Sequence, residues 1–312
     1  MISVVISVYN EVESLHIFYE RLIQTIKILD EPFEIVFVDD GSTDNSLEIL
    51  KEIAAKDKKV KIFSFRRNQG KAEALTFGFQ KAKGDYVITL DADLQDKPKE
   101  IGKLLEEMEK GKWDLVCGWR KERKDSIGKV FSSQLFNSIA SIFWGLKLHD
   151  YNCGLKLYAK DAAKSLTLYG GMHRFIPLLV HDRGFTVTEV PVEHAKRKYG
   201  KSKYGFSKIL KDLPDIFTMF FLSKYSKRPF HFFGVAGALL ILIGIVILGY
   251  LTYLRLLGET IGQRPLLFFG MLLVISGFQV FFTGFLADLI INLSQRSDGS
   301  GIDKILLKYE SK

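Results

Sequence analysis

Three residues with oxygen-bearing side chains follow a strongly apolar segment in the first third of the chain. Residues 86–90 read Tyr-Val-Ile-Thr-Leu, a pattern typical of a buried β-strand, and Asp91, Asp93 and Gln95 come directly after it. Carboxylate and amide oxygens are hard ligands, so these side chains could together bind one Mg²⁺ or Mn²⁺. The alternative is that Asp91 and Asp93 only cap the helix that Pro98 begins.

Two more strand-like segments, residues 2–8 and 33–38, also end in polar side chains. The carboxyl ends of parallel strands meet at one edge of a sheet, which is where open α/β sheets bind ligands. We therefore expect the same sheet edge to gather the residues that follow all three strands. The additional polar residues are Tyr9, Glu11, Asp39 and Asp40.

The residues around these strand ends match a known pattern. The set SVYNE (7–11), VDDGSTDNS (38–46), RRNQGKAEAL (66–75) and LDADLQDKP (90–98) resembles the inverting family 2 glycosyltransferases. This resemblance implies an α/β protein with a GT-A domain, a mostly parallel sheet and a nucleotide-sugar donor. It further implies that Tyr9, Glu11 and Asp40, with Asp39 as second choice, bind the nucleotide base and ribose. The structural alternatives are core packing for Tyr9 and helix capping for the three acids.

Apolar residues are concentrated in the C-terminal part of this 312-residue chain, of which 47% is hydrophobic. Residues 232–253 and 266–286 carry almost no charge, and each run reaches the roughly 20 residues that a membrane-spanning helix needs. We expect two transmembrane helices, the alternative being buried core helices. The predicted domains are a GT-A catalytic domain at 1–204, a juxtamembrane amphipathic helix at 205–229, two transmembrane helices within 230–291 and a cytoplasmic tail at 292–312.

Basic residues lie on the outer flanks of the two apolar runs. By the positive-inside rule this bias places both ends of the chain, and the catalytic domain, on the cytoplasmic side of the inner membrane. No signal peptide pattern is present at the N-terminus. The formal charge of +8 is explained by anionic lipid and phosphate, and no nucleic-acid recognition motif is present. The flanking residues are Lys224, Lys227, Arg228, Arg296, Lys304 and Lys308.

The rest of the N-terminal part alternates between helical and strand-like patterns, which predicts a mostly parallel sheet. Apolar stripes predict helices near residues 15–29, 47–53 and 101–108, and further strands are predicted at 60–65, 115–118, 155–158 and 186–192. Two aromatic-rich segments differ: residues 132–144 are expected in the core, and residues 206–222 as an interfacial helix. Cys117 and Cys153 are expected to be free thiols.

Further motifs narrow the resemblance to the polyprenyl-phosphate glycosyltransferases, similar to bactoprenol glucosyltransferases and dolichyl-phosphate mannose synthase. The motifs are GWR (118–120), NCGLKLY (152–158) and RKYGKSK (197–203). They imply a polyprenyl phosphate acceptor, with Arg120 and Lys156 as catalytic residues that clamp the substrate phosphates and a substrate-binding group of Arg197, Ser202 and Lys203. Lys156 stands where relatives often have arginine, so a point charge replaces a bidentate fork.

The predicted chemistry follows from charge. An ion held by Asp93 and Gln95 would neutralise the leaving nucleotide, with Asp91 directed to metal-bound water, ribose or sugar. The acceptor phosphate has a second pKa of about 6 and is already a nucleophile near neutral pH, so no strong general base is needed. Direct attack gives a β-linked product. Glucose from UDP-glucose is the first choice of donor, and GDP-mannose and UDP-N-acetylglucosamine stay open.

Two rival classes are disfavoured. A processive polysaccharide synthase normally has a Gln-x-x-Arg-Trp motif and more spans, and a non-catalytic scaffold would tolerate loss of the Asp-x-Asp pair, which is intact. Glycines at intervals of seven line one face of each predicted span, and small residues allow helices to approach closely in lipid. They predict a homo-oligomer, unless they pack the two spans of one chain. These glycines are Gly237, Gly244, Gly270, Gly277 and Gly284.

Overall fold

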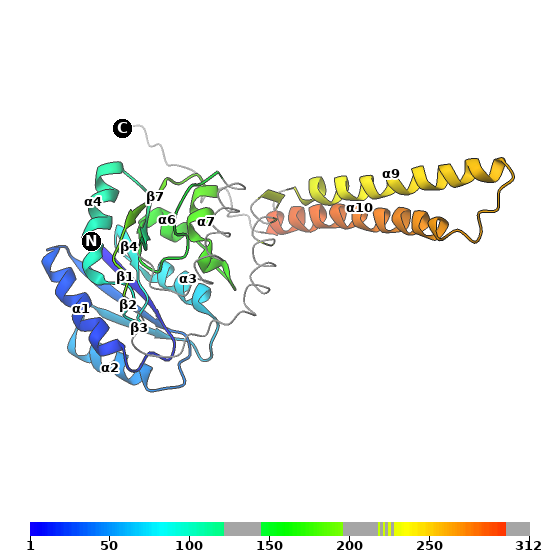
Figure 1. Cartoon of the computed structure of the whole chain (residues 1–312). Coiled ribbons are helices and arrows are strands. Elements are labelled where there is room, and N and C mark those ends of the chain that lie inside the picture. Colours follow the sequence, from blue (N-terminus) through cyan, green and yellow to red (C-terminus); the bar gives the residue numbers. More distant parts are fainter. Residues whose placement is uncertain (122–144, 196–217, 219–220, 222–223, 226–227, 298–312) are drawn as a thin grey trace. The chain divides into compact units, whose positions relative to one another are not determined.

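The computed structural model describes residues 1–121, 145–195, 218, 221, 224–225 and 228–297. The chain divides into two units, Met1–Met219 and Phe220–Lys312. The first contains a sheet with helices on both faces, and the second contains two long apolar helices (Figure 1). The predicted segment 132–144 and nearly all of segment 206–222 lie outside the described residues.

The first unit is built on a seven-stranded sheet in the order β3-β2-β1-β4-β6-β5-β7. Only β6 runs antiparallel to its two neighbours, and every other adjacent pair is parallel. The mostly parallel α/β sheet predicted from the sequence is therefore confirmed, and each predicted strand is present within one or two residues of its expected bounds. The strands are β1 Ile2–Val8, β2 Phe33–Asp39, β3 Val60–Ser64, β4 Tyr86–Thr89, β5 Leu115–Trp119, β6 Lys156–Ala159 and β7 Val187–Pro191.

Helices cover both faces of this sheet (Figure 1). Helices α1 (Leu15–Ile28), α2 (Ser46–Lys56) and α4 (Ile101–Gly111) pack on one face, where the predicted apolar stripes join one core cluster with the strands, α4 lying against β5 and β6. The other face carries α3 (Lys71–Lys81), α6 (Lys160–Ser165) and α7 (Ile176–Asp182). Because helices lie on both faces, the strands are buried on both sides and read as continuous apolar runs.

The direction of β6 decides which residues meet at the edge of the sheet where β1, β2 and β4 end, here called the functional edge. The parallel strands β1, β2 and β4 all end at this edge, whereas the antiparallel β6 begins there. Lys156 pairs with Thr89 in the register of β4 and β6. A lysine that is distant in sequence is thereby placed two residues from Asp91.

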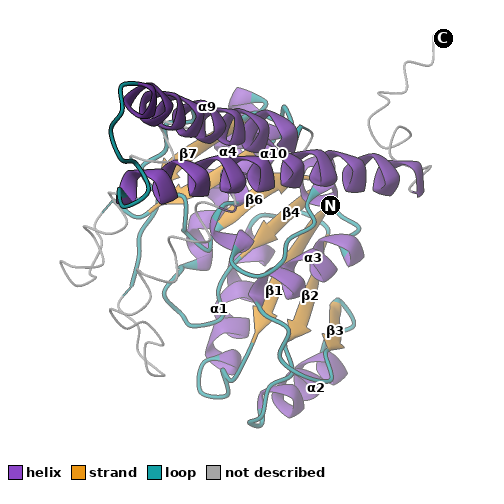
Figure 2. Cartoon of the chain, turned by 90° about the vertical axis from the view of Figure 1, so that its right-hand side faces the viewer, coloured by secondary structure: helices purple, strands orange, loops and turns teal. Residues whose placement is uncertain are grey.

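The second unit consists of α9 (Pro229–Leu256) and α10 (Pro265–Ser297), which lie side by side in both views (Figures 1 and 2). Both are long and apolar enough to cross a membrane, as predicted. Pro229, the first residue of α9, has no backbone N–H group. The backbone N–H of the next residue, Phe230, donates to the Asp288 side chain of α10 at 3.4 Å. The two helices are thus joined by a polar contact near the start of α9.

Glycines allow the backbones of α9 and α10 to touch. A Cβ atom on Gly237 would lie 2.7 Å from the carbonyl oxygen of Gly277, and one on Gly244 would lie 2.9 Å from that of Gly270. The predicted glycine face is therefore covered within one chain. The homo-oligomer stays a prediction, and these glycines no longer offer an uncovered face to support it.

Candidate active site

The chain turns sharply after β4, and this turn positions the predicted metal ligands. Leu94, between Asp93 and Gln95, has a φ of 63°, in the left-handed region that leucine rarely adopts. The backbone N–H of Gln95 donates to Oδ1 of Asp93 at 3.1 Å. Lys97, rather than either aspartate, precedes the short 3-10 helix η1 (Pro98–Glu100), so the capping alternative for Asp91 and Asp93 is wrong.

Asp91 contacts a lysine from a different element. The ammonium of Lys71, the first residue of α3, donates to Oδ1 of Asp91 at 2.5 Å. Burial alone would raise the pKa of Asp91, but the charge and hydrogen bond of Lys71 outweigh it, with help from Lys156, so the pKa is lowered. Asp91 is therefore an ionised carboxylate, and one of its oxygens is paired with an ammonium group.

Asp40 holds the start of α3 in place. Its carboxylate accepts hydrogen bonds from the backbone N–H groups of Gln69 at 2.7 Å and Gly70 at 3.1 and 3.0 Å, and from the side chain of Asn68 at 2.9 Å. Burial, opposed by these bonds, raises its pKa. Gly70, at φ 116°, precedes Lys71, so Asp40 also fixes the lysine that binds Asp91.

The remaining predicted nucleotide-binding residues lie at the ends of β1 and β2. Asp39 is buried and accepts from the N–H of Ser42 at 3.2 Å and the hydroxyl of Ser64 at 2.7 Å. Glu11 accepts from the hydroxyl of Ser14 at 3.0 Å, immediately before α1. Tyr9 directly follows β1 and is half-buried. The structure thus brings all four predicted residues to the functional edge, and their nucleotide contacts stay predictions.

The segment after β7 is bonded to the turn that carries the metal ligands. The backbone N–H of Ala195 donates to the carbonyl oxygen of Gln95 at 2.9 Å, and Asp96 pairs with His194 in an isolated antiparallel bridge. The side-chain amide nitrogen of Gln95 lies 3.5 Å from the carbonyl oxygen of Ala195. The amide oxygen of Gln95 therefore points away from Ala195. Three predicted residues farther along lie outside the described residues: Arg197, Ser202 and Lys203.

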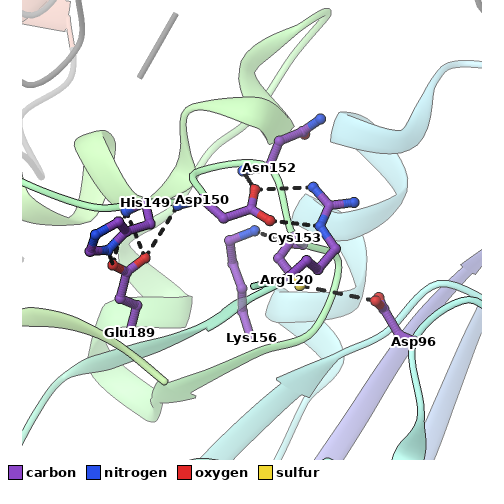
Figure 3. A network of polar contacts seen from close by, with 8 residues as sticks. All are labelled: Asp96, Arg120, His149, Asp150, Asn152, Cys153, Lys156 and Glu189. Atoms are coloured by element: carbon purple, nitrogen blue, oxygen red, sulfur yellow. Dashed lines mark hydrogen bonds and ion pairs between the residues drawn. The ribbon is translucent and has the colours of Figure 1, made fainter. Parts of the chain in front are cut away.

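Arg120 forms a bidentate ion pair with a buried aspartate (Figure 3). Its Nε and Nη2 atoms donate to Asp150 at 2.6 and 3.0 Å, and the Asp150 side chain is 0% exposed. Burial lowers the pKa of Arg120, but the hydrogen bonds and charge of Asp150 raise it by more. The net pKa is therefore raised, and the guanidinium stays charged. The predicted phosphate clamp at Arg120 is therefore already paired within the protein, and its contact with substrate stays a prediction.

Cys153 contacts Asp96, its Sγ lying 4.0 Å from Oδ1 of the carboxyl group (Figure 3). Asp96 is buried, and burial together with the charges of Asp91 and Asp93 raises its pKa to about 7. A Cβ atom on Gly154 would lie 2.5 Å from Asp96 and 2.8 Å from Asp91, so only glycine fits between these carboxylates. Cys153 is a free thiol whose pKa is raised by burial, and Cys117 is likewise free, as predicted.

Lys156 and His173 complete a small pocket beside Asp91. Lys156 is buried, and its ammonium donates to the carbonyl oxygen of Cys153. His173 belongs to the 3-10 helix η2 (Met172–Arg174), and burial, followed by the charge of Lys71, lowers its pKa to about 3. The imidazole is therefore neutral near pH 7. The polar lining of the pocket includes Lys71, Asp91, Lys156 and His173.

A divalent ion fits the donor chemistry of this edge only together with a substrate. Within the described residues, no three His, Cys, Asp or Glu side chains are arranged to hold a metal. Asp93 and Gln95 supply hard oxygens, and Mg²⁺ commonly uses one or two carboxylates plus substrate phosphates. The two residues therefore suit an ion that arrives with a diphosphate.

Sequence reasoning missed three residues of this site. Lys71 lies within the motif RRNQGKAEAL (66–75) but has no role assigned from the sequence, and the sequence does not single out Asp150 or His173. Lys71 had a usable signal, because it begins a helix directly after a glycine, close to the predicted nucleotide site. Asp150 and His173 gave no local signal: Asp150 is 30 residues from Arg120 in sequence, and His173 meets Lys71 and Asp91 only through the fold.

Comparison with known proteins identifies the family. A profile of the family described as Glycosyl transferase family 2 matches residues 3–167, which is more than half of the chain. The chain belongs to glycosyl transferase family 2. This confirms the enzyme class predicted from the sequence.

Relatives within glycosyl transferase family 2 extend over both units. The dodecaprenyl-phosphate galacturonate synthase of Rhizobium johnstonii is 36% identical over 304 residues, covering 96% of this chain and 90% of the relative. The undecaprenyl-phosphate 4-deoxy-4-formamido-L-arabinose transferase of Proteus mirabilis is 35% identical, with 93% and 88% covered. Both names are those of polyprenyl-phosphate glycosyltransferases, so the predicted subgroup is confirmed. Their sugars differ from each other and from glucose.

Solved structures of the same fold support the GT-A architecture. Glucosyl-3-phosphoglycerate synthase from Mycobacterium tuberculosis, crystallised with Mn²⁺ and UDP-glucose, matches with a TM-score of 0.53 at 20% identity, covering 72% of this chain and 78% of that one. At this identity the likeness concerns the fold alone. The predicted GT-A fold is confirmed.

Proposed function

We propose that this enzyme transfers a sugar from a nucleotide diphosphate donor to polyprenyl phosphate at the cytoplasmic face of the inner membrane. The observation that carries the proposal is the joint placement of Asp91, Asp93, Gln95 and Lys156 at one sheet edge, in a chain that also contains two membrane-length helices. Oxygen ligands and a buried cation are the groups that a diphosphate-bearing donor needs. The relatives' names agree with a polyprenyl phosphate acceptor.

The donor's diphosphate is proposed to bind with Mg²⁺ or Mn²⁺ at Asp93 and Gln95. When bound, the ion would neutralise the negative charge that develops on the leaving nucleotide. Asp91, whose Oδ1 is paired with Lys71, is proposed to contact the donor's sugar or ribose rather than the ion. Tyr9, Glu11, Asp39 and Asp40 are proposed to form or support the site for the base and ribose.

The acceptor phosphate is proposed to act as the nucleophile itself. Its second pKa of about 6 makes it mostly a dianion near neutral pH, so the protein need not remove a proton. Arg197 and Lys203 are proposed to bind this phosphate, with Ser202 beside them. Arg197 follows Ala195 by two residues, and Ala195 is bonded to Gln95, which supports this assignment. Attack opposite the leaving nucleotide gives a β-linked sugar phosphate from an α-linked donor.

The identity of the sugar is a separate question. The sequence favoured glucose from UDP-glucose, whereas the names of two relatives carry galacturonate and 4-deoxy-4-formamido-L-arabinose. The likeness to these relatives therefore gives no support to glucose. We retain UDP-glucose as one member of a donor panel, alongside GDP-mannose, UDP-N-acetylglucosamine and UDP-uronic acids.

The proposal is tested with the full chain reconstituted in vesicles that contain undecaprenyl phosphate. Each radiolabelled donor of the panel is added with Mg²⁺ or Mn²⁺, and label is measured in the chloroform phase. We expect one donor to label the lipid only when undecaprenyl phosphate is present. Label that instead enters a chloroform-insoluble polymer would support the processive synthase, and no transfer from any donor would support the scaffold.

The acceptor site has its own test. The variant Arg197→Ala should lower the transfer rate far more than it weakens binding of the free nucleoside diphosphate, measured by calorimetry. Equal losses in both measurements would move Arg197 to the donor site.

A further inference from the structure

The pocket beside Asp91 has a feature that diphosphate binding leaves unused. It lies between the start of α3, the paired ends of β4 and β6, and η2, and it has room for about one water-sized group. Its lining combines polar side chains with Leu75 and Ile176, and it includes Asn152, which is exposed, so the pocket reaches the surface.

His173 presents a hydrogen-bond acceptor to this pocket. Its Nδ1 atom is buried and has no hydrogen-bond partner among the described residues. The ring is neutral and has a hydrogen bond with the backbone of Gly170. We assign the ring proton to Nε2, so that Nδ1 carries the lone pair. A buried acceptor without a partner is costly, and the pocket therefore needs an occupant that donates a proton to Nδ1.

Lys156 presents donors to the same pocket. It is 3% exposed, and its ammonium has three N–H groups, one of which is used by the carbonyl oxygen of Cys153. Among the described residues no carboxylate lies within ion-pair distance of it, and the carboxylate of Asp91 acts on it only through longer-range charge. The pocket therefore also needs an occupant that accepts from Lys156.

One group satisfies both residues. A hydroxyl donates one hydrogen bond and accepts others, so it can bridge Lys156 and His173. A carboxylate would accept from Lys156 but has no proton for Nδ1 of His173, and a methyl group would satisfy neither. We propose that this pocket receives one hydroxyl group of the donor sugar, which accepts from Lys156 and donates to His173. This inference rests on the proposed function and makes His173 a specificity-determining residue.

The geometry explains why such a pocket lies here. Asp91 lines it and is the carboxylate proposed to contact the sugar, so a hydroxyl that enters the pocket places the sugar ring over the end of β4. Lys71 binds Asp91 and lines the same pocket, and it keeps that carboxylate in place. The hydroxyl pocket and Asp91 together would orient the sugar for attack.

The test uses the full-length enzyme, the donor from the panel that it turns over best, and the deoxy analogues of that donor at each ring position. For wild type we expect one analogue to lose about 10- to 100-fold in kcat/KM, because it leaves two buried polar groups unpaired. The variant His173→Leu should have a kcat/KM for the parent donor that is lower than that of wild type by a similar factor. For this variant, removing the hydroxyl group from the donor should lower kcat/KM little further. Its affinity for the free nucleoside diphosphate should be unchanged.

Two matched variants complete the design. His173→Asn, which retains an acceptor oxygen, should recover part of the activity, whereas His181→Leu, at an exposed position on α7, should behave as wild type. Equal acceptance of all deoxy analogues by wild type would overturn the inference and leave the proposed function intact. Equal loss of nucleoside diphosphate and donor binding in His173→Leu would also overturn it, since His173 would then support the nucleotide site rather than recognise the sugar. If wild type transfers no sugar at all, the proposed function fails and the inference with it.

Discussion

Replacing Asp150 with asparagine should destabilise the catalytic domain strongly. Asp150 is fully buried, and its carboxylate accepts two hydrogen bonds from Arg120 and one from the N–H of Asn152 at 3.1 Å. Asparagine keeps the shape but leaves the mostly buried guanidinium without its bidentate counter-ion, and breaking a buried pair in this way costs about 3–5 kcal/mol. For a domain of about 200 residues this lowers the melting temperature by about 6–20 °C.

The measurement is a thermal unfolding curve of the full-length enzyme in detergent, followed by tryptophan fluorescence. Trp119 lies one residue before Arg120, so the probe is close to the altered pair. A melting temperature within about 2 °C of wild type would contradict the reasoning, because less than about 1 kcal/mol would then depend on the pair.

A double variant separates the structural role of Arg120 from the predicted catalytic one. Arg120→Met combined with Asp150→Leu removes both charges, and apolar replacement of a buried pair is often neutral or stabilising. We expect its melting temperature to return most of the way to that of wild type. If the stable double variant transfers sugar normally, the predicted phosphate contact of Arg120 is wrong; if it is inactive, Arg120 also acts on substrate.

Three further outcomes are expected. Asp93→Asn should abolish transfer without changing the melting temperature, and excess chelator should inhibit wild type; near-normal turnover in either experiment would remove the proposed metal site. Gly277→Leu should lower the thermal stability of the α9–α10 pair, because its Cβ would lie 2.8 Å from the carbonyl oxygen of Gly237. The control Gly249→Leu should not, because the space around that Cβ is open. Light scattering on wild type and both variants tests the predicted homo-oligomer, which a monomeric wild type would refute. Between pH 7 and pH 5 wild type should lose about 2 kcal/mol of unfolding free energy relative to His173→Leu. The reason is that the histidine of the unfolded chain binds a proton below about pH 6.5, whereas the folded ring, with its pKa near 3, does not. A stability difference between the two proteins that stays constant with pH in denaturant titrations would contradict this.

The strands and the membrane-length helices were predictable because each is marked by a local pattern. Residues 2–8 and 33–38 are continuous apolar runs, as expected for strands that are covered on both faces. Their carboxyl ends mark the edge of the sheet where the candidate site lies. The two C-terminal runs are each long and apolar enough to cross a membrane, and each forms one long helix in the structure. The predicted donor-side acids lie at or within a few residues of the ends of β1, β2 and β4, which the same local patterns mark, and their substrate contacts stay predictions.

The pairings inside the site were not predictable in the same way. Lys71 is 20 residues from Asp91 and approaches it only because α3 starts at the edge where β4 ends. Lys156 reaches the site because β6 is antiparallel, and no local pattern distinguishes that direction. Arg120 was interpreted as a phosphate ligand because a lone arginine in a motif gives no sign of Asp150, its partner 30 residues later.

The most direct test of the central claim is the stoichiometry and identity of the products. After reaction of the full chain with its preferred donor and undecaprenyl phosphate, chromatography measures the released nucleotide, and mass spectrometry and NMR identify the lipid. We predict one nucleoside diphosphate released per lipid formed, and a single phosphate joining a β-linked sugar to the polyprenyl chain. Release of nucleoside monophosphate with a lipid diphosphate sugar, or an α-linked product, would contradict direct attack by the lipid phosphate on the sugar.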